Sequence, residues 1–268
     1  QKNINKLDKN KLIKYPNTKI FLNKLAVLKR NHINTKVIAI TGSSGKTTLK
    51  TLIGKTLNEY GKTYFSQKSY NNHIGVPLSL CNLENDHKYG VFEVGMSNKG
   101  EIRKLSSLVK PDIAIITNIG EAHIENFDNL NGIAKAKSEI IEKINEGGFL
   151  ILNRDDKYFD YLLKRTKKRK INVLSFGLSS KASARLINNR VHKNYNALHF
   201  RVLNKNIYLK VKNINSLIIS NILSTLLTLH VLDLDLSKIV NFQDYFQLVE
   251  GRGKTHSILR YKKKFQLI

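Results

Sequence analysis

The chain has 268 residues, of which 41% are hydrophobic, so it is long enough and apolar enough to build one large globular core. It contains no run of about 18 apolar residues, and no apolar stretch follows the charges at its N-terminus, which argues against a transmembrane helix and a secretory signal. The single cysteine, Cys81, excludes an internal disulfide framework and predicts a reducing, cytoplasmic location. Its apolar neighbours in the sequence predict a buried thiol.

The formal net charge of +26 makes nucleic-acid binding an alternative to consider. Lysine is spread along the whole chain, however, and only residues 164–170 (KRTKKRK) form a dense basic run. Such runs usually form a solvated face, and a basic surface also suits substrates that carry phosphates. We therefore expect no nucleic-acid partner and keep nucleic-acid binding as the less favoured alternative.

The first 35 residues are polar and predict a short strand and a helix over residues 21–30. From residue 37 onward, short apolar segments alternate with segments of helical periodicity. Strands are expected at 37–41, 62–65, 89–95, 112–119 and 147–153, and helices at about 46–60, 76–83, 100–109, 132–144 and 158–168. This alternation is typical of a parallel sheet with crossover helices.

Beyond residue 171 the pattern changes to consecutive short strands at 172–178, 182–192, 196–204 and 206–211, with a tight turn at 204–206. A mostly apolar helix follows at 214–232. The sequence therefore predicts an α/β fold, with a mostly parallel sheet flanked by helices and a small antiparallel sheet beside it.

A glycine-rich loop joins the first of these strands to its helix, and it consists of Gly42, Ser43, Ser44, Gly45, Lys46, Thr47 and Thr48. Glycines let consecutive backbone N–H groups point at one anion, and the N-terminus of the following helix adds a favourable dipole. Lys46 can hold the β- and γ-phosphates of a nucleotide, and the Thr47 hydroxyl can bind Mg²⁺. The widespread phosphate-loop pattern would have a glycine at Ile40, so the form here is T-G-x-x-G-K-T-T instead.

The loop T-G-S-S-G-K-T-T resembles that of the Mur ligases, and further segments agree in order and spacing: residues 69–80 (SYNNHIGVPLSL), 92–102 (FEVGMSNKGEI), 117–127 (TNIGEAHIENF), 133–140 (IAKAKSEI) and 251–256 (GRGKTH). The resemblance covers about residues 12–268. It is strongest to the branch of the family that adds D-alanyl-D-alanine to UDP-N-acetylmuramoyl-tripeptide. It implies an ATP-dependent amide ligase of peptidoglycan precursor synthesis that works through an acyl phosphate.

In domain terms, the resemblance implies the tail of a UDP-substrate domain and a linker over residues 1–35. It implies a P-loop-containing central ATP-binding domain over residues 36–268. The end of that domain and a third domain are expected to lie beyond Ile268. The chain begins with Gln1 rather than Met, so we expect a processed or partial chain that does not complete the ligase reaction by itself.

The resemblance also implies a set of metal and catalytic residues. Thr47, Glu93 and His123 are expected to bind two Mg²⁺ ions. Lys137 lies 14 positions after His123, and by resemblance it carries a carbamate that turns a cation into an anionic ligand; Lys135 is the next candidate. Lys46, His123 and Lys137 are the expected catalytic residues.

The remaining expected contacts are with ATP and the substrates. By resemblance Asn221 meets the adenine and Arg252 meets the ATP phosphates, while Asn71 and Asn72 line the muramoyl-peptide side. Family members carry His-Asn in place of Leu217 and Ile218, so the adenine contacts of this chain depart from the family pattern. Asn118 and Glu121 lie nearby in the sequence, and whether they line the site or bind metal stays open.

Three other readings remain alternatives. The first is a sister ligase of the diaminopimelate-adding or folylpolyglutamate type, against which the segments 71–77 and 120–123 argue. The second is a basic P-loop NTPase that binds nucleic acid, for which charge alone speaks. The third is a catalytically inactive regulatory fragment.

Overall fold

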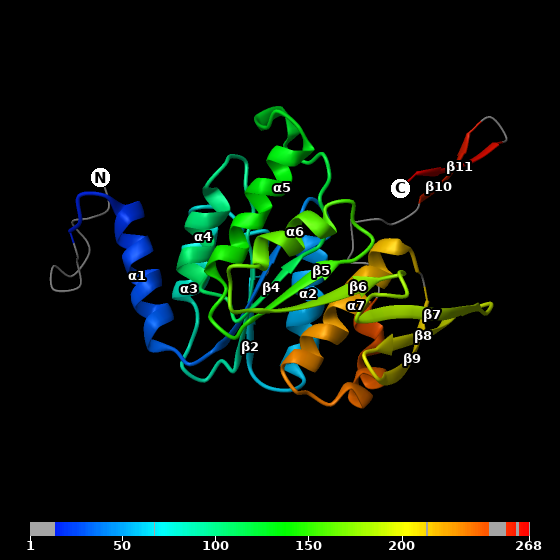
Figure 1. The fold of residues 1–268 in the computed structure, drawn as a ribbon. Coiled ribbons are helices and arrows are strands. Elements are labelled where there is room, and N and C mark those ends of the chain that lie inside the picture. The colour runs from blue at the N-terminus through cyan, green and yellow to red at the C-terminus, as the bar shows by residue number, and fades with distance from the viewer. Residues whose placement is uncertain (1–13, 67, 213, 247–255, 261–262, 268) are drawn as a thin grey trace.

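The computed structural model describes residues 14–66, 68–212, 214–246, 256–260 and 263–267 (Figure 1). The α-helices are α1 (Thr18–His32), α2 (Lys46–Asn58), α3 (Gly75–Cys81), α4 (Glu101–Val109), α5 (Leu130–Ser138), α6 (Phe159–Thr166) and α7 (Ser216–Val231). Shorter 3₁₀ segments are η3 (Ile124–Asn126), η4 (Glu139–Lys143) and η5 (Leu236–Phe246).

The strands form a nine-stranded sheet in the order β2-β3-β1-β4-β5-β6-β7-β8-β9. They are β1 (Lys36–Thr41), β2 (Thr63–Phe65), β3 (Tyr89–Glu93), β4 (Ile113–Ile116), β5 (Phe149–Asn153), β6 (Asn172–Gly177), β7 (Ala184–Val191), β8 (Asn196–Val202) and β9 (Lys205–Val211). A separate hairpin pairs β10 (His256–Arg260) with β11 (Lys263–Leu267). The alternation of strands and helices predicted from the sequence is therefore confirmed.

Strand β1 lies between β3 and β4 and is parallel to both. The other strands of the sheet are therefore added on either side of β1. This is a topological switch point, where open parallel sheets bind ligands beyond the carboxyl ends of their strands. In register, Ile40 lies beside Glu93 on one side and Ile115 on the other. The end of β1 is therefore the place where the fold brings together the loops that follow three strands.

Two hydrophobic clusters cover the two faces of the sheet. Helices flank the sheet on both sides (Figure 1). Successive residues of β1 point to opposite faces, so Ile38 and Ile40 enter one cluster, whereas Val37 and Ala39 enter the other. The first cluster packs under α2, α7 and η5, and the second under α1 and α3 to α6. Because both faces are covered, β1 is buried from Val37 to Thr41, and residues 37–40 form a continuous apolar run.

The predicted antiparallel strands lie beside the parallel ones, and they belong to the same sheet. The segment 172–178 forms β6, which pairs in parallel with β5, and β7 pairs in parallel with β6. In the described part of this sheet, the antiparallel pairs are β7 with β8 and β8 with β9, and these strands continue the same sheet. Their inner residues join the cluster under α7, so apolar burial extends the sheet instead of starting a second one.

Three local expectations also need correction. Helix α1 is longer than the predicted helix at 21–30, whereas the predicted strand before it stays a prediction, because residues 1–13 lie outside the described residues. The expected helix at 132–144 is α5 followed by the 3₁₀ segment η4. Cys81 is half-buried, not buried, because it ends α3 with one side toward solvent; burial raises the pKa of its thiol.

Helix α1 docks on the sheet domain through its buried Ala26 and through Arg30. The Arg30 guanidinium donates to the carbonyls of Val109 and Lys110 at 2.8 Å each, at the end of α4. Desolvation lowers the pKa of Arg30, while Asp112, 3.7 Å away, opposes that shift. The domain boundary at residue 35 stays a prediction, but the helix before it contacts the domain after it.

Candidate functional site

The loop after β1 needs glycine at two positions. Gly42 has φ of 146°, and a side chain there would come within 1.9 Å of the Thr117 hydroxyl. Gly45 has φ of 80°, and a side chain there would meet Leu217 of α7 at 2.8 Å. Both glycines allow a backbone turn that L-residues adopt poorly and let neighbouring segments approach closely. The turn ends at Lys46, the first residue of α2, whose N-terminus opens into the site.

The segment after β4 braces this loop. Asn118 Oδ1 accepts the N–H groups of Ser43 and Ser44 at 3.1 and 3.0 Å, and Asn118 Nδ2 donates to the Ser44 hydroxyl. Ser43 Oγ and the Gly120 backbone bond to each other in both directions, at 2.9 and 2.8 Å. Asn118 therefore contacts the loop backbone itself, which gives this residue a positioning role.

A cluster of oxygen ligands lies at the carboxyl end of β3. Glu93 is 2% exposed, and its carboxylate accepts the Thr47 hydroxyl at 2.8 Å and Asn71 Nδ2 at 2.7 Å. Ser69 Oγ lies 3.0 Å from Thr47 Oγ1. The prediction that the Glu93 carboxylate and the Thr47 hydroxyl lie within reach of one metal ion is confirmed; their role as metal ligands stays a prediction.

Lys46, His123 and Lys137 line one cavity of about 400 Å³, together with Asn71 and Asn72. Lys46 Nζ donates to the carbonyls of Gly42 and Ser43, at 2.8 and 3.3 Å. His123 is exposed and has φ of 63°, a region that histidine enters at a cost in backbone strain. The three residues predicted as catalytic from the sequence thus meet at one place.

Lys137 is 2% exposed, whereas Lys135, on the same helix, is exposed. Burial, together with the nearby Lys46 ammonium, lowers the pKa of Lys137 to about 7. An amine with this pKa is neutral in about half of the molecules at pH 7, and a neutral amine is a nucleophile. The geometry therefore favours Lys137 over Lys135 as the reactive lysine of this helix.

A second cavity, of about 610 Å³, lies on the other side of the loop, between the strand ends and α7. Ser44 and Asn118 line it from the loop side, and Asn221, which is 3% exposed, lines it from α7. Leu217 lies against Gly45 and belongs to the same wall. The glycine-rich loop thus lies between a cavity lined partly by apolar side chains and the cavity lined by the three catalytic candidates.

The other residues predicted from the sequence lie as follows. Asn72 lines the cavity of Lys46, but its Oδ1 accepts the N–H groups of Ile74 and Gly75, so this side chain also caps the start of α3. Glu121 is exposed beside His123, and Thr48 is half-buried on α2. Arg252 lies outside the described residues.

Sequence reasoning missed two residues next to the site, Ser69 and Lys50. Ser69 contacts Thr47, and Lys50 is fully buried on α2, where its Nζ contacts Ser66 and Lys68. A lysine one helical turn after Lys46 was the only signal for Lys50. Nothing in the sequence pointed to Ser69, because its contact with Thr47 joins two different loops.

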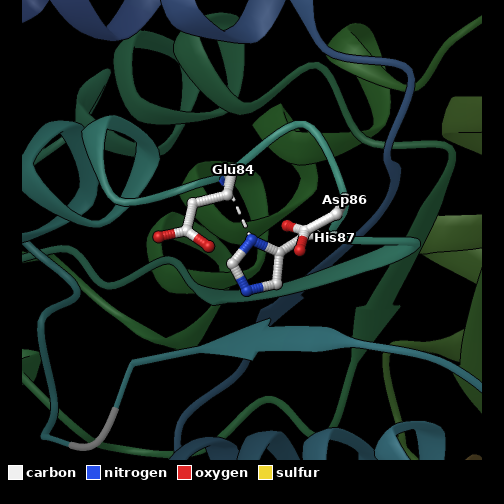
Figure 2. Close-up of side chains that lie close together, drawn as sticks. All are labelled: Glu84, Asp86 and His87. Carbon is white, nitrogen blue, oxygen red and sulfur yellow. Dashed lines mark hydrogen bonds between the residues drawn. The ribbon is translucent and has the colours of Figure 1, made fainter.

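One group of three His or acidic side chains in the described residues could hold a metal: Glu84, Asp86 and His87, in the turn before β3 (Figure 2). Lys62 Nζ donates to both carboxylates at 2.7 Å, and His87 Nδ1 accepts the N–H of Glu84 at 2.8 Å. The turn precedes β3, so it lies at the opposite edge of the sheet from Glu93. These contacts stabilise a turn, and we assign the group no part in the site.

Among the described residues, no helix has both the length and the apolar character needed to cross a membrane.

Comparison with known proteins now gives the family. Residues 40–229 match the model of the Mur ligase middle domain. UDP-N-acetylmuramoyl-tripeptide--D-alanyl-D-alanine ligase of Rickettsia prowazekii is 35% identical over 252 residues, which are 94% of this chain and 56% of that protein. A crystal structure of MurF from Acinetobacter baumannii aligns with a TM-score of 0.83 at 28% identity, over 94% of this chain and 54% of that one.

A MurF ligase from Thermotoga maritima, solved in complex with ADP, has a TM-score of 0.81 at 24% identity over 93% of this chain and 57% of that one, which shows the same fold. The chain spans about half the length of the relatives it matches. The fold, the phosphate loop and the matched residues agree, and the chain belongs to the Mur ligase family, whose middle domain it contains.

Proposed function

We propose that this chain is the ATP-binding part of an amide ligase that adds D-alanyl-D-alanine to UDP-N-acetylmuramoyl-tripeptide in the cytoplasm, during peptidoglycan precursor synthesis. The observation that carries the proposal is the meeting of three features at one sheet edge. These are the phosphate loop, the contact between Thr47 and Glu93, and the cavity shared by Lys46, His123 and Lys137. A relative named for this activity is 35% identical over 94% of the chain.

The two cavities divide the substrates between them. The polyphosphate of ATP would lie on the loop, where the N–H groups of the α2 N-terminus and Lys46 favour negative charge. The base would enter the cavity lined by Asn221 and Leu217. The acceptor carboxylate would then approach from the opposite side, through the cavity of Asn71 and Lys137. This arrangement brings the γ-phosphate between the two cavities.

The residues at the end of β3 fit a magnesium ion. Mg²⁺ prefers oxygen ligands, and a buried carboxylate beside a threonine hydroxyl supplies both kinds found in nucleotide sites. Glu93 and Thr47 would hold one ion, and His123 and a modified Lys137 a second. Bound Mg²⁺ offsets the negative charge that gathers when a phosphoryl group is transferred.

Lys137 fits the role of a carbamylated lysine. The neutral amine would attack CO₂, forming an N–C bond, and the proton released would pass to solvent, leaving a carbamate anion. Burial keeps the pKa of Lys137 at about 7, so the reactive form is available near neutral pH. The Lys46 ammonium, which opposes a positive charge on Lys137, would stabilise a negative one.

In the reaction, a carboxylate oxygen of the acceptor attacks the γ-phosphorus of ATP, and ADP leaves. The amine of D-alanyl-D-alanine then attacks the acyl carbon, and phosphate leaves as the amide forms. Lys46 and the α2 N-terminus hold the charge on the phosphates in both steps. Asn118 keeps the loop N–H groups in place before the nucleotide arrives.

A comparison of three amine substrates, each supplied separately, tests the assignment within the family. The full-length protein, ATP, Mg²⁺ and UDP-N-acetylmuramoyl-tripeptide would be incubated with D-alanyl-D-alanine, meso-diaminopimelate or L-glutamate, and ADP release would be followed. We expect release that depends on the acceptor only with D-alanyl-D-alanine. Release with one of the other amines instead would assign the chain to a sister ligase.

A further inference from the structure

Lys50 of α2 is among the largest side chains without any exposed surface in the described part of the chain. Lysine is almost never fully buried unless its ammonium has partners, because desolvation of the charge is costly. Lys50 lies three residues after Thr47 and four after Lys46, on the helix that begins at the phosphate loop. The burial of the Lys50 ammonium is therefore to be explained by its contacts near the glycine-rich loop.

The ammonium of Lys50 contacts the segment that joins β2 to α3. Lys50 Nζ donates to Ser66 Oγ at 3.2 Å and to the carbonyl of Lys68 at 2.9 Å. The same carbonyl accepts the N–H of Tyr70 at 2.8 Å, which closes a tight turn. β2 is a three-residue edge strand that pairs only with β3 in the described sheet. The segment after it therefore depends on side chains to hold its backbone.

This segment supplies two side chains to the oxygen cluster. Ser69 Oγ lies 3.0 Å from Thr47 Oγ1, and Asn71 Nδ2 donates to Glu93 at 2.7 Å. The carbonyl of Asn71 also accepts the N–H of Gly95, just beyond β3. The segment thus touches both Thr47 and Glu93, the residues proposed to hold a metal ion.

We infer that Lys50 is a positioning residue for the metal and phosphate site. Its ammonium holds the turn at Lys68–Tyr70 against α2 by hydrogen bonding. That turn then positions Ser69 beside Thr47 and Asn71 beside Glu93. The inference rests on the proposed function, because it assigns Lys50 to the site where ATP and Mg²⁺ would bind. This role requires the N–H donors of the Lys50 ammonium. A side chain of equal length without these donors will therefore leave the segment after β2 without its hydrogen bonds to α2.

The test compares Lys50→Met with the parent in the full-length protein. Methionine is about as long as lysine and suits an apolar environment, so the fold will persist while the two donated bonds are lost. We expect the Mg²⁺ concentration for half-maximal activity to rise, or kcat to fall, by about 10- to 100-fold, as when outer partners of metal ligands are removed. The KM for D-alanyl-D-alanine will change little.

A second readout needs no turnover. Hydrogen exchange in the peptide over residues 66–75 should become about tenfold faster in Lys50→Met, whereas exchange over α4 should not change. Ser66→Ala removes one acceptor and keeps the lysine, and it should shift both readouts in the same direction but less. Lys55→Met, which removes an exposed lysine from the same helix, is the matched control and should behave as the parent.

The outcomes separate the two claims. If a folded Lys50→Met kept the parental Mg²⁺ dependence, kcat and exchange over 66–75, the positioning role would be wrong. If Lys50→Met failed to fold, Ser66→Ala would decide, and parental values in both of its readouts would overturn the role. If the parent made no amide product but Lys50→Met still loosened residues 66–75, the proposed function would fail while the structural link stood.

Discussion

Three lysines around the phosphate loop differ in burial, and burial decides what each can do. Lys46 is half-buried and lies over the loop carbonyls, where a phosphate would replace them as its partner. Lys50 is fully buried and tied to a neighbouring turn. Lys137 is buried beside Lys46, and its lowered pKa makes it the reactive one.

Replacing Lys46 tests the loop directly. Lys46→Ala removes a charge-assisted contact with the phosphates, worth about 1.5–3 kcal/mol, so the affinity for a non-hydrolysable ATP analogue with Mg²⁺ should fall about 10- to 150-fold. Isothermal titration calorimetry on the parent and the variant measures it. Lys55→Ala, exposed on the same helix, is the control. Equal affinity in Lys46→Ala and the parent would count against the loop as the phosphate site.

The buried amine of Lys137 predicts a pH-dependent stability. Its folded pKa of about 7 lies below the ordinary lysine value of 10.5. Below pH 7 the amine is protonated in the folded and unfolded states alike, and the full cost of burying its charge is present. Between pH 7 and 10.5 the folded state binds fewer protons, so this cost declines as the pH rises. The cost is on the order of 5 kcal/mol at its largest.

Lys137→Met should therefore be more stable than the parent at pH 6, and its advantage should shrink by about 3 kcal/mol between pH 6 and pH 9. Urea unfolding in CO₂-depleted buffer, on both proteins, measures the difference. Lys135→Met removes an exposed lysine from the same helix and should give a constant difference. A constant difference for Lys137→Met as well would contradict a lowered pKa.

At the residue scale, the sequence motifs predicted residues of the candidate site, but they did not predict the side-chain contacts between separate segments. Gly42, Lys46 and Thr47 follow from the loop pattern, because their roles depend on backbone shape and on order along the chain. The contact of Thr47 with Glu93 agrees with the rule that parallel strands end at one edge of the sheet, where both residues lie. Lys50 and Ser69 could not be found this way, since their contacts join segments whose relative positions only the fold defines.

At the scale of elements, hydrophobic periodicity placed the strands and helices, but it did not place the last strands in the sheet. Strands β8 and β9 alternate between polar and apolar residues over most of their length, as the strands of an antiparallel hairpin commonly do. The pattern is the same whether such strands form their own sheet or extend another. Packing of Leu198 and Phe200 under α7 decided the outcome, and that contact spans elements far apart in the sequence.

Phe200→Ala tests whether these strands share the main core. Phe200 has no exposed surface, so the variant should lose about 3–5 kcal/mol of unfolding free energy. Tyr208, on the outer face of β9, is 61% exposed, and Tyr208→Ala should cost less than about 1 kcal/mol. Thermal unfolding should keep a single transition that shifts as a whole. A shift confined to a second, separate transition would mean that β7–β9 fold independently.

At the scale of the whole molecule, the chain contains the proposed nucleotide site and spans about half the length of its relatives. A ligase must hold ATP, an acceptor carboxylate and an amine together, and proximity supplies much of its rate. The acyl phosphate must also be shielded from water. We therefore expect the 268-residue chain to bind nucleotide without completing ligation, whereas the full-length protein does both.

Mass spectrometry of the ligation product tests the central claim most directly. Full-length protein, its Lys46→Ala variant and the 268-residue chain would each be incubated with ATP, Mg²⁺, UDP-N-acetylmuramoyl-tripeptide and D-alanyl-D-alanine. The account predicts UDP-N-acetylmuramoyl-pentapeptide from the full-length protein, with one ADP released per amide formed, and little or none from the other two. Absence of pentapeptide from a folded full-length protein that binds ATP would contradict the assigned reaction.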